Sequence, residues 1–377
     1  MIKVLSIVLN NFKNDSRVLK ENISLQNAGY HVKVVALHEE PLKEFEKVQC
    51  IPVHRVKLKT RAWSKYPLVQ LIKYLEFIYR VIKKYRKTDI LHCNDLNTLP
   101  AGVFAKMFNR KLKLVYDSHE YAINDTPYES KISIWLKYFI ERILIQFADK
   151  VITVSNSIAN EYKRLYNIPK PSLILNCPRY HEQQKKDIFR NEFNIRSDQN
   201  IFLYQGGLSH GRGIEILLET FKIIDDDNSV IVFMGYGPLE GLIKESSKEY
   251  ENIYFHPAVP PDELLDFTSS ADFGISTIED SCLSYRYCLP NKMFEYLMAE
   301  IPVIVSNLIE MRRLVENNRI GIVAKSNTLA GLQEAITEAL QLDKKILQKS
   351  IQIVKNIYNW EEQEKVLLNL YKDLYAN

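Results

Sequence analysis

Short apolar runs alternate with amphipathic segments along nearly the whole chain, and this alternation limits the possible folds more than any other feature. The runs have the length of buried strands, and the segments between them carry apolar residues at helical spacing. Because strands that alternate with helices assemble into parallel sheets, the sequence predicts an α/β protein. The predicted strands are residues 3–9, 32–37, 90–93, 112–116, 151–154, 201–204, 230–233, 253–256, 273–276 and 303–306.

The chain divides into two series of strands and helices. At 377 residues it is long for a single hydrophobic core, so two domains of ordinary size are expected. A polar, proline-containing break at residues 176–187 separates the two series, and we place the linker there. The sequence therefore predicts two Rossmann-like, doubly wound domains over residues 1–178 and 187–357. Residues 358–377 have the pattern of a last helix.

The helical pattern that begins after Pro290 is suited to hold an anion. Pro290 lacks the N–H that the first turn of a helix leaves unpaired, so it indicates a helix start. Asn291 and Lys292 follow at the position where backbone donors and the helix dipole attract negative charge. Glu295 lies one turn further on, where its carboxylate can accept from ribose hydroxyls. The group predicts a nucleoside diphosphate site, although alone it fits an ordinary solvated helix equally well.

Two glycine turns follow predicted strands in the same half of the chain. Residues 206–213 lead from a strand into a helical pattern, and residues 235–238 follow the next strand. Glycine lets the backbone approach a phosphate closely, and Arg212 can clamp a phosphate with two donors. Neither turn is a Walker A loop or a Gly-x-Gly-x-x-Gly fingerprint. Because ligands bind beyond the carboxyl ends of parallel strands, the turns and the helix start predict one binding rim.

With these motifs the chain resembles the GT-B glycosyltransferases, and among them the retaining group usually numbered family 4. The resemblance covers nearly the whole chain and also rests on residues 14–19, 116–120 and 271–275. It implies that the two Rossmann-like domains face each other across a cleft. The first domain then binds the acceptor, the second binds the nucleotide-sugar, and the last helix crosses back to the first domain.

The resemblance also implies a reaction. A hexose-type sugar would move, with retention, from a nucleotide-diphosphate donor to a glycan. UDP is the nucleotide expected from its frequency in the family. The expected acceptor is a lipid-linked glycan or a cell-surface polysaccharide or lipopolysaccharide.

Single residues receive roles from the same resemblance. His119 matches a histidine that lines the active site and contacts the donor sugar. Arg212 and Lys292 are expected to hold the diphosphate, and Glu295 matches the second carboxylate of a Glu-x7-Glu motif that binds ribose. The other expected donor contacts are Gly206, Gly207, Gly235, Val259 and Asn291. The acceptor candidates are Asn14, Asp15, Asp95 and Glu120; for the two aspartates, capping of the next helix is an equal alternative.

The sequence departs from the family pattern at the donor site. Gly207 stands where the family has arginine, and Arg212 stands where it has lysine. Tyr287 occupies the place of the first carboxylate, for which Glu279 or Asp280 could substitute. Two other functions therefore stay open: a nucleotide-sugar epimerase of the same fold, and a non-catalytic glycosyltransferase-like partner protein.

No metal or resident cofactor is expected. No pair of carboxylates with ligand spacing flanks a predicted rim, and the acidic run at residues 225–227 has the pattern of a turn after a helix. Arg212 and Lys292 would neutralise the leaving diphosphate in place of a metal ion. The five cysteines are widely spaced and include no Cys-x-x-Cys pair, so we expect reduced cysteines and a cytoplasmic protein.

Charge is divided unevenly along the chain. Residues 1–178 hold 29 Lys and Arg against 16 Asp and Glu, a net charge of +13, whereas the remainder holds 21 against 30, a net charge of −9. Most of the excess lies in Arg55–Lys87, which has eleven basic residues and one acidic residue, Glu76. The split predicts that the first domain meets an anionic partner. Because the segment has no RNA-recognition motif, we expect no nucleic acid.

An apolar stripe at helical spacing accompanies these basic residues. We expect most of the stripe to pack on the sheet of its domain and the cations to face solvent. The cations then predict an anionic membrane surface as the partner, with Trp63 and Tyr66 as interfacial anchors. We expect neither a signal peptide nor a transmembrane helix, and therefore a peripheral location at the inner face of the cell membrane. The stripe consists of Leu68, Leu71, Ile72, Leu75, Ile78, Tyr79 and Ile82.

Overall fold

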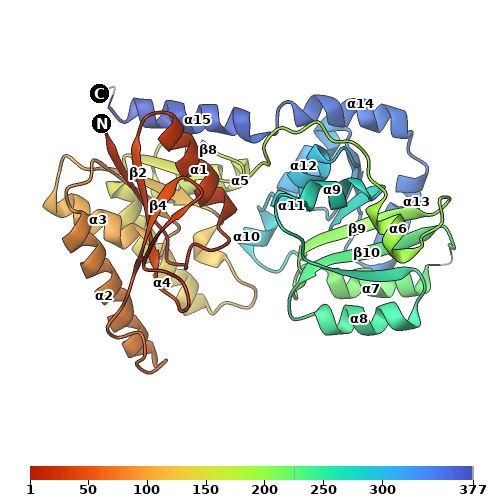
Figure 1. Cartoon of the computed structure of the whole chain (residues 1–377), viewed down its shortest axis with the longest axis horizontal. Coiled ribbons are helices and arrows are strands. Elements are labelled where there is room, and N and C mark those ends of the chain that lie inside the picture. Colours follow the sequence, from red (N-terminus) through yellow and green to blue (C-terminus); the bar gives the residue numbers. More distant parts are fainter. Residues whose placement is uncertain (225, 376–377) are drawn as a thin grey trace. The chain divides into compact units, whose positions relative to one another are not determined.

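The computed structural model describes residues 1–224 and 226–375, which form two compact units (Figure 1). Unit 1 consists of Met1–Asp125, Glu129–Ile174 and Glu364–Asn377, and unit 2 consists of Thr126–Tyr128 and Leu175–Gln363. Each unit has its own sheet with helices around it, so the predicted α/β class is confirmed. Among the described residues, no helix combines the length and the apolar character needed to span a membrane.

Unit 1 is built on an eight-stranded sheet with the order β3-β4-β2-β1-β5-β6-β7-β8. All neighbouring strands are parallel except β3 and β4, which pair antiparallel. Helices cover both faces of a parallel sheet, and this is why its central strands are buried along their whole length. The strands are β1 Lys3–Ile7, β2 His31–Leu37, β3 Phe45–Val48, β4 Ile51–Val56, β5 Ile90–Asn94, β6 Lys113–Ser118, β7 Lys150–Thr153 and β8 Ser172–Leu173.

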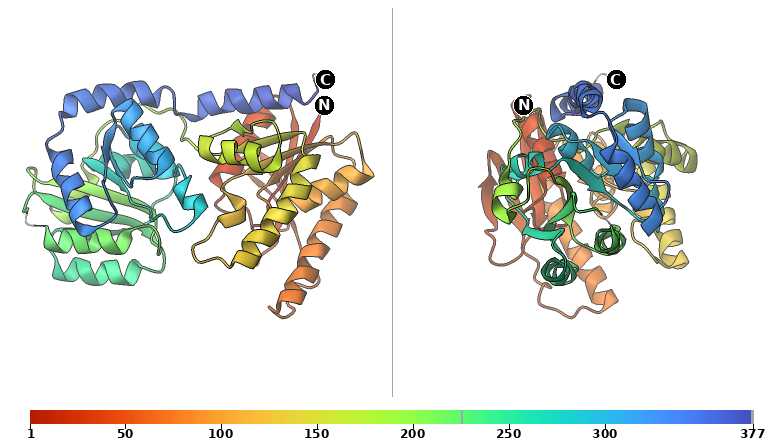
Figure 2. Two further views of the ribbon diagram at one scale, coloured as in Figure 1. Left: turned by 180° about the vertical axis from the view of Figure 1, so that it is seen from behind. Right: turned by 90° about the vertical axis from the view of Figure 1, so that its right-hand side faces the viewer.

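The helices of unit 1 lie on two faces of this sheet. The connection through α1 runs toward the β3 edge, whereas those through α2, α3, α4 and α5 run toward the β8 edge. Because such connections are right-handed, these four helices lie on the face opposite α1. Helix α3 contacts both α2 and α4, and the view from behind shows the three together (Figure 2). The bounds are α1 Ser16–Asn27, α2 Pro67–Tyr85, α3 Leu99–Phe108, α4 Lys131–Leu144 and α5 Asn156–Tyr166, with short 3₁₀ turns η1 Ala122–Asn124 and η2 Ile145–Phe147.

Unit 2 has a six-stranded parallel sheet with the order β11-β10-β9-β12-β13-β14. Its apolar side chains form one core layer on each face of the sheet. The strands are β9 Asn200–Gly207, β10 Ser229–Tyr236, β11 Ile253–Pro257, β12 Phe273–Ser276, β13 Val303–Val305 and β14 Gly321–Val323. The helices are α6 Ile188–Phe193, α7 Ile214–Ile223, α8 Glu240–Glu249, α9 Leu264–Ser269, α10 Leu283–Arg286, α11 Asn291–Met298, α12 Ile309–Asn318, α13 Leu329–Leu340 and α14 Lys344–Lys355.

The last helix, α15 (Trp360–Asp373), contributes to both units. Its first residue, Trp360, is fully buried and donates its backbone N–H to the carbonyl of Pro178 at 2.8 Å. From Glu364 onward the chain belongs to unit 1, where the ring of Tyr371 is fully buried.

All ten strands that the sequence predicts are present, with ends shifted by a few residues. Four strands were missed. β3 and β4 carry polar residues within a short hairpin, where Pro52 and the buried Arg55 obscure the apolar pattern. β8 and β14 have two and three residues, which is too short for a periodicity to show.

The prediction was wrong for five of the seven residues in the apolar stripe on α2. Leu68, Leu71 and Leu75 are 76%, 51% and 51% exposed, and Ile72 and Tyr79 also face solvent. From the stripe the helix buries Ile78, together with Phe77, Val81 and Lys73. The reason is that α2 has apolar residues on more than one face. The face that packs against the rest of unit 1 carries residues 73, 77 and 81, which are spaced by four.

Two of the eleven predicted surface cations are also inside the unit. The guanidinium of Arg55 is buried, donates to the carbonyls of Asn11 and Lys43 at 2.6 and 3.0 Å, and pairs with Glu46. The ammonium of Lys73 donates to the carbonyl of Trp63 at 2.8 Å. These two side chains stabilise loops of unit 1 and are not available to an anionic surface.

Candidate functional site

The carboxyl ends of β9 and β10 approach each other more closely than side chains would permit. Gly206 and Gly235 are paired in the sheet, and a Cβ on Gly235 would lie 1.9 Å from the carbonyl oxygen of Gly206. Gly206 has a φ of +112°, which favours glycine. A Cβ on Gly206 would lie 3.8 Å from Cε of Lys292. The glycine turns therefore bring backbone directly against the predicted phosphate ligand.

Lys292 lies in the first turn of α11, whose N-cap is Pro290, as the sequence predicts. Its Nζ is 3.6 Å from the centroid of the buried Tyr204 ring. Burial and the positive charge of Arg212 lower the pKa of Lys292 to about 7, although the carboxylate of Glu295 opposes this shift. A lysine that is desolvated beside a second cation would gain from an anion bound at the same place.

Arg212 is held in the glycine turn that precedes α7. Its guanidinium carbon lies 4.6 Å from the centroid of the Tyr285 ring, and its backbone carbonyl accepts from Oγ1 of Thr277 at 3.1 Å. Gly211 and Gly213 on either side have φ of +77° and +69°. Stacking on Tyr285 orients the guanidinium, so the short helix α10, which carries Tyr285, supports Arg212.

Glu295 lies on α11 one turn beyond Lys292 and is half-buried. Its Oε2 accepts from Nε2 of Gln205 at 2.6 Å, and Oε1 of Gln205 accepts from Oγ1 of Thr268 at 2.8 Å. These two hydrogen bonds fix the orientation of the Gln205 amide, so that its N–H group donates to the carboxylate of Glu295. Gln205 and Thr268 were not predicted as site residues, because nothing in the sequence connects β9 and α9 to the α11 carboxylate.

The other predicted donor residues lie around the same rim. Asn291 is exposed at the first position of α11, and Val259 is half-buried after β11. A Cβ on Gly207 would meet no atom within 4 Å, so the missing family arginine leaves open space. Of the two possible substitutes for the first carboxylate, Asp280 pairs with Arg286 at 2.8 Å. Glu279 is half-buried, and its backbone N–H donates to the carbonyl of Gly211 at 3.1 Å.

In unit 1, His119 directly follows β6 and lies between two carboxylates. Its Nδ1 is 3.4 Å from Oδ2 of Asp95, its Nε2 is 3.4 Å from Oδ2 of Asp117, and its side chain is 21% exposed. Its backbone N–H also donates to Asp95 at 3.1 Å. Burial opposes a charge on the ring, but the two carboxylates outweigh it and raise the pKa of His119 to about 9. At neutral pH the imidazole is therefore protonated and fixed in orientation.

Asp117 connects His119 to a buried ionic network. Both of its oxygens accept from Nη2 of Arg17 at 3.0 Å, and Nε of Arg17 lies 3.2 Å from Glu21. His92 lies 3.5 Å from Asp117 through Nε2, and its Nδ1 is 2.7 Å from the Tyr371 hydroxyl. Arg17 was not predicted as a site residue, although it lies within residues 14–19, and no sequence pattern pointed to His92 or Tyr371.

The network also contains a possible metal-ligand set. Glu21, His92 and Asp117 present ligand atoms that all lie within 4.8 Å of one another. Arg17 contacts both carboxylates, however, so its guanidinium already supplies the positive charge that a metal ion would bring. The arrangement is an ion network that fixes Asp117, and Arg17 together with His119 holds the pKa of Asp117 well below its usual range despite burial.

The acceptor candidates of unit 1 have different surroundings. Asp15 caps α1 by accepting from the backbone N–H of Val18, as its structural alternative predicted. The carboxylate of Asp95 contacts His119 and caps no helix in the structure. Asn14 and Glu120 are exposed.

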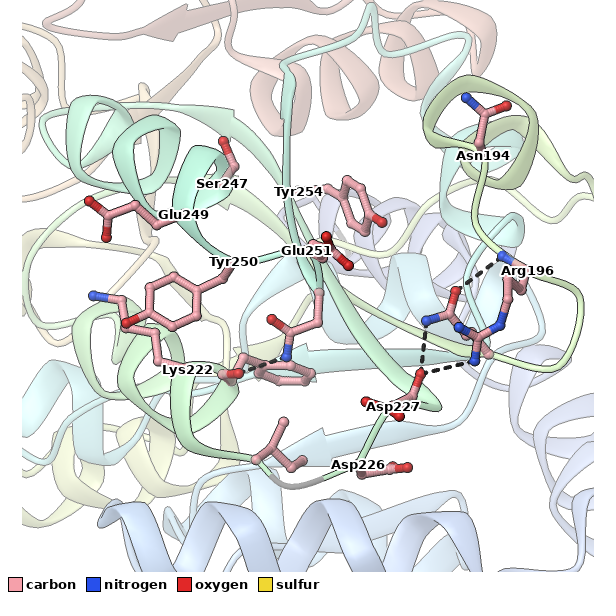
Figure 3. Close-up of a pocket in the computed structure, with 14 residues that line it drawn as sticks. Asn194, Arg196, Lys222, Asp226, Asp227, Ser247, Glu249, Tyr250, Glu251 and Tyr254 are labelled. Carbon is pink, nitrogen blue, oxygen red and sulfur yellow. Dashed lines mark hydrogen bonds between the residues drawn. The ribbon is translucent and has the colours of Figure 1, made fainter.

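A separate pocket in unit 2 lies at the other end of the strands, where the chain enters β9, β10 and β11 (Figure 3). There Arg196 and Gln199 donate to the backbone carbonyl of Asp227 at 3.3 and 2.9 Å (Figure 3). Asp226 accepts from Asn228 and Ser229 in a turn, and Asp225 lies outside the described residues. Because this pocket is far along the strands from the glycine turns, it is not part of the predicted rim.

The chain matches two family models. The model described as Glycosyltransferase Family 4 covers residues 23–177, and the model described as Glycosyl transferases group 1 covers residues 185–360. The chain belongs to the group 1 GT-B glycosyltransferases. Each of the two strand–helix series of the glycosyltransferase thus matches one family model.

Curated relatives of the glycosyltransferase are distant but extend over most of its length. An uncharacterised glycosyltransferase of Methanocaldococcus jannaschii is 22% identical and covers 91% of this chain and 90% of its own. A chitobiosyldiphosphodolichol beta-mannosyltransferase of Debaryomyces hansenii is 24% identical and covers 96% and 85%. A putative teichuronic acid biosynthesis glycosyltransferase of Bacillus subtilis is 24% identical and covers 66% and 60%.

Solved structures have the same fold. Sucrose-phosphate synthase of Thermosynechococcus elongatus has a TM-score of 0.81 at 18% identity and covers 100% of both chains. The Anabaena protein HepE, solved with UDP and glucose, has a TM-score of 0.75 at 14% identity and covers 99% of this chain and 100% of its own. At such identities the likeness establishes the fold of the glycosyltransferase.

Proposed function

We propose that the protein transfers a hexose-type sugar, with retention and without a metal ion, from a UDP-sugar to a glycan. The observation that carries this proposal is the convergence of Lys292, Arg212 and Glu295 on the glycine turns of unit 2. Two cations match a diphosphate, and a carboxylate one turn away matches ribose hydroxyls. The preference for UDP follows from the family and is supported by the UDP in the HepE structure.

The two cations act on the leaving group. Negative charge grows on the diphosphate as the glycosidic bond breaks, and fixed positive groups stabilise that charge more in the transition state than before it. Lys292 gains a proton as the anion binds, because the diphosphate relieves its desolvation and its repulsion by Arg212. His119, protonated and held by Asp95 and Asp117, donates to the sugar that is transferred.

The acceptor is proposed to be a glycan carried on a lipid or on the cell surface. Two relatives support this class, since one is named for a dolichol-linked acceptor and another for teichuronic acid biosynthesis. Unit 1 would bind it, with Asn14, Asp15, Asp95 and Glu120 as candidate contacts. A retaining transfer in which attack and departure share one face of the sugar requires no carboxylate nucleophile.

A peripheral location at the inner face of the cell membrane goes with such an acceptor. The exposed cations of Arg55–Lys87 are proposed to contact acidic headgroups. They are Lys57, Lys59, Arg61, Lys65, Lys83, Lys84, Arg86 and Lys87.

A donor screen tests the function. The protein is mixed with UDP-, GDP-, TDP- and ADP-hexoses, with and without a polyisoprenoid diphosphate-linked glycan, and nucleotide release and the anomeric linkage of the product are followed. Acceptor-dependent release of UDP with an α-linked product from an α-linked donor is expected. Conversion of the free donor without acceptor would indicate an epimerase. Nucleotide binding with no turnover for any donor–acceptor pair would indicate a non-catalytic partner protein. Such a result would agree with Gly207 and Tyr287, which replace the arginine and the first carboxylate of the family pattern.

A further inference from the structure

Helix α4 of unit 1 has the reverse of the usual polarity of a surface helix. Its residues 132, 135, 136, 139 and 143 follow helical spacing and form one apolar stripe. This stripe faces solvent, since Ile132 is 79% exposed and Trp135 is 61% exposed. A helix on the surface of a soluble protein normally turns such a stripe toward the core.

The inward face of α4 explains why the helix is held in this orientation. Glu141 is fully buried there, and its carboxylate accepts hydrogen bonds from the hydroxyls of Tyr116, Tyr162 and Tyr166 at 2.5, 2.8 and 2.5 Å. These bonds satisfy a charged group in the interior and fix the rotation of α4 about its axis. The outward position of the apolar stripe is therefore built into the packing of unit 1.

The apolar surface continues over the two neighbouring helices on the same face of the sheet. On α3, Met107 and Phe108 are 62% and 79% exposed. On α2, five residues of the apolar stripe also face solvent: Leu68, Leu71, Ile72, Leu75 and Tyr79. Because α3 contacts both α2 and α4, the three stripes belong to one helical layer, which we call the outer helical face. Single exposed apolar residues are common, but a surface of this extent marks an interaction site.

Basic residues outnumber acidic residues around the outer helical face. Glu129 and Asp149, which lie beyond the ends of α4, pair with Lys137 and Lys106. The only acidic residues within α2, α3 and α4 are Glu76, which binds Thr60 and Arg80, and the buried Glu141. Exposed basic residues lie at or just beyond the helix ends. They are Lys83, Arg86, Lys87, Arg110, Lys111, Lys131 and Arg142.

We propose that the outer helical face inserts into the headgroup and acyl-chain boundary of an anionic membrane, with α4 as its principal contact. Apolar stripes would enter the lipid, Trp135 would lie at the boundary, and the basic residues would contact acidic headgroups. This assigns membrane binding mainly to α3 and α4, beyond the Arg55–Lys87 segment. It rests on the proposed function only in that a membrane-held acceptor gives the contact a purpose.

The charge favours a membrane over a second copy of the chain. In a two-fold dimer the same surface meets itself, so the excess of basic residues on each copy would be brought against the same excess on the other. An acidic lipid surface complements both the apolar stripe and the cations. A dimer through this face is therefore the competing outcome in the experiment.

Tryptophan fluorescence tests the insertion in the full chain. The protein has Trp63, Trp135 and the buried Trp360, so Trp63→Phe leaves Trp135 as the exposed reporter. Vesicles of phosphatidylcholine with phosphatidylglycerol should shift its emission to the blue, and brominated acyl chains should quench it. Vesicles of phosphatidylcholine alone should bind at least tenfold more weakly. An unchanged spectrum with acidic vesicles would overturn the proposal.

A pair of charge insertions locates the contact. Leu136→Glu with Phe139→Glu changes two exposed positions of α4, and Ile346→Glu with Ile353→Glu makes the same change on α14 of unit 2, where both residues are also exposed. Cosedimentation with acidic vesicles should fall at least tenfold for the α4 variant and remain unchanged for the α14 variant. Equal binding by both variants would overturn the assignment, as would a lipid-free dimer that only the α4 variant dissociates.

Binding and catalysis are separable in this design. Vesicle binding is measured without donor or acceptor, so it can succeed even if the protein transfers no sugar. Conversely, the α4 variant should retain turnover on an acceptor with a short, water-soluble lipid. If the wild type does not bind acidic vesicles but transfers sugar normally, the membrane inference is overturned and the proposed function remains intact.

Discussion

Lys292 and Arg212 place two positive charges at one rim before any anion is present. Desolvation and this repulsion keep the pKa of Lys292 near 7, so the side chain is partly neutral in the free protein at physiological pH. A bound diphosphate reverses the balance, because an anion favours the charged ammonium. We therefore expect donor binding and protonation of Lys292 to be coupled.

Nucleotide binding should take up a proton in the alkaline range. At pH 8 the free Lys292, with a pKa of about 7, is largely neutral, and UDP should return it to the charged form. Calorimetry in two buffers of different ionisation enthalpy measures the uptake. Lys292→Arg, which stays charged, should abolish it, and Lys292→Ala should lower turnover by roughly 10²–10³. Identical apparent enthalpies in both buffers would refute the coupling.

Glu295 is expected to bind the ribose of the donor. Glu295→Gln removes a charged acceptor, and hydrogen bonds to charged groups are worth about 1.5–3 kcal/mol, so UDP affinity should fall roughly tenfold to hundredfold. Titration with UDP and with its 2′- and 3′-deoxy analogues checks the partner. With the analogue that lacks the contacted hydroxyl, Glu295→Gln should cause no further loss of affinity. If the losses of affinity from the substitution and from the missing hydroxyl are fully additive, ribose is excluded as the partner of Glu295.

The charge on His119 should depend on Asp95. The folded pKa of about 9 lies above the usual 6.5, so the charged ring stabilises the fold fully below pH 6.5 and this contribution is lost as pH rises to 9. Asp95→Asn removes one of the two carboxylates and should lower the pKa, which imidazole NMR titration measures. The loss of stability between pH 6.5 and 9 should shrink in this variant and vanish in His119→Gln. An unshifted titration would contradict the assignment.

At the scale of elements, the ends of β9 and β10 decide the shape of the donor rim. Their close approach depends on glycine at two paired positions, and the backbone that they bring together contacts Lys292. The same rim is completed by α11, which starts at Pro290, and by α10, which supports Arg212 through Tyr285.

Gly235→Ala should damage nucleotide binding more than folding. The added methyl would lie 1.9 Å from the carbonyl oxygen of Gly206, so the paired ends of β9 and β10 must shift apart beside Lys292. Such overpacking costs about 1–3 kcal/mol of stability. UDP titration and thermal unfolding check both effects. Gly241→Ala on α8, where a Cβ meets nothing within 4 Å, is the control and should bind normally; normal binding by Gly235→Ala would refute the role of the close approach.

At the scale of the whole molecule, we propose that positive side chains take the place that a metal ion has in other transferases. Arg212 and Lys292 are proposed to do so for the donor, and Arg17 pairs with two members of the one set of potential metal ligands found among the described residues. Both arrangements follow the same rule, that a guanidinium or ammonium fixed by its neighbours can neutralise oxygen anions.

Activity should therefore survive removal of divalent ions. Turnover is measured after dialysis against EDTA, with the metal content of the protein determined by mass spectrometry. Undiminished turnover is expected. Loss of turnover that Mg²⁺ or Mn²⁺ restores would show that the two cations do not suffice.

Much of the fold was readable from the sequence because buried parallel strands are short continuous apolar runs. Ten strands and the start of α11 at Pro290 were predicted in this way. The edge strand β3 and its neighbour β4 were missed. β4 buries Arg55, whose guanidinium is satisfied by carbonyls that are distant in sequence. Local patterns carry no information on such partners.

For the candidate site, the sequence identified the residues that belong to local motifs, and the tertiary structure decided what surrounds them. Lys292, Glu295 and His119 could be named from the residues beside them. The neighbours that set their charge or orientation, such as Tyr204, Gln205 and Asp95, come from other strands. The sequence also showed the apolar stripe of α2, but only the packing of Phe77, Ile78 and Val81 decided which way this helix faces, because α2 has apolar residues on more than one side.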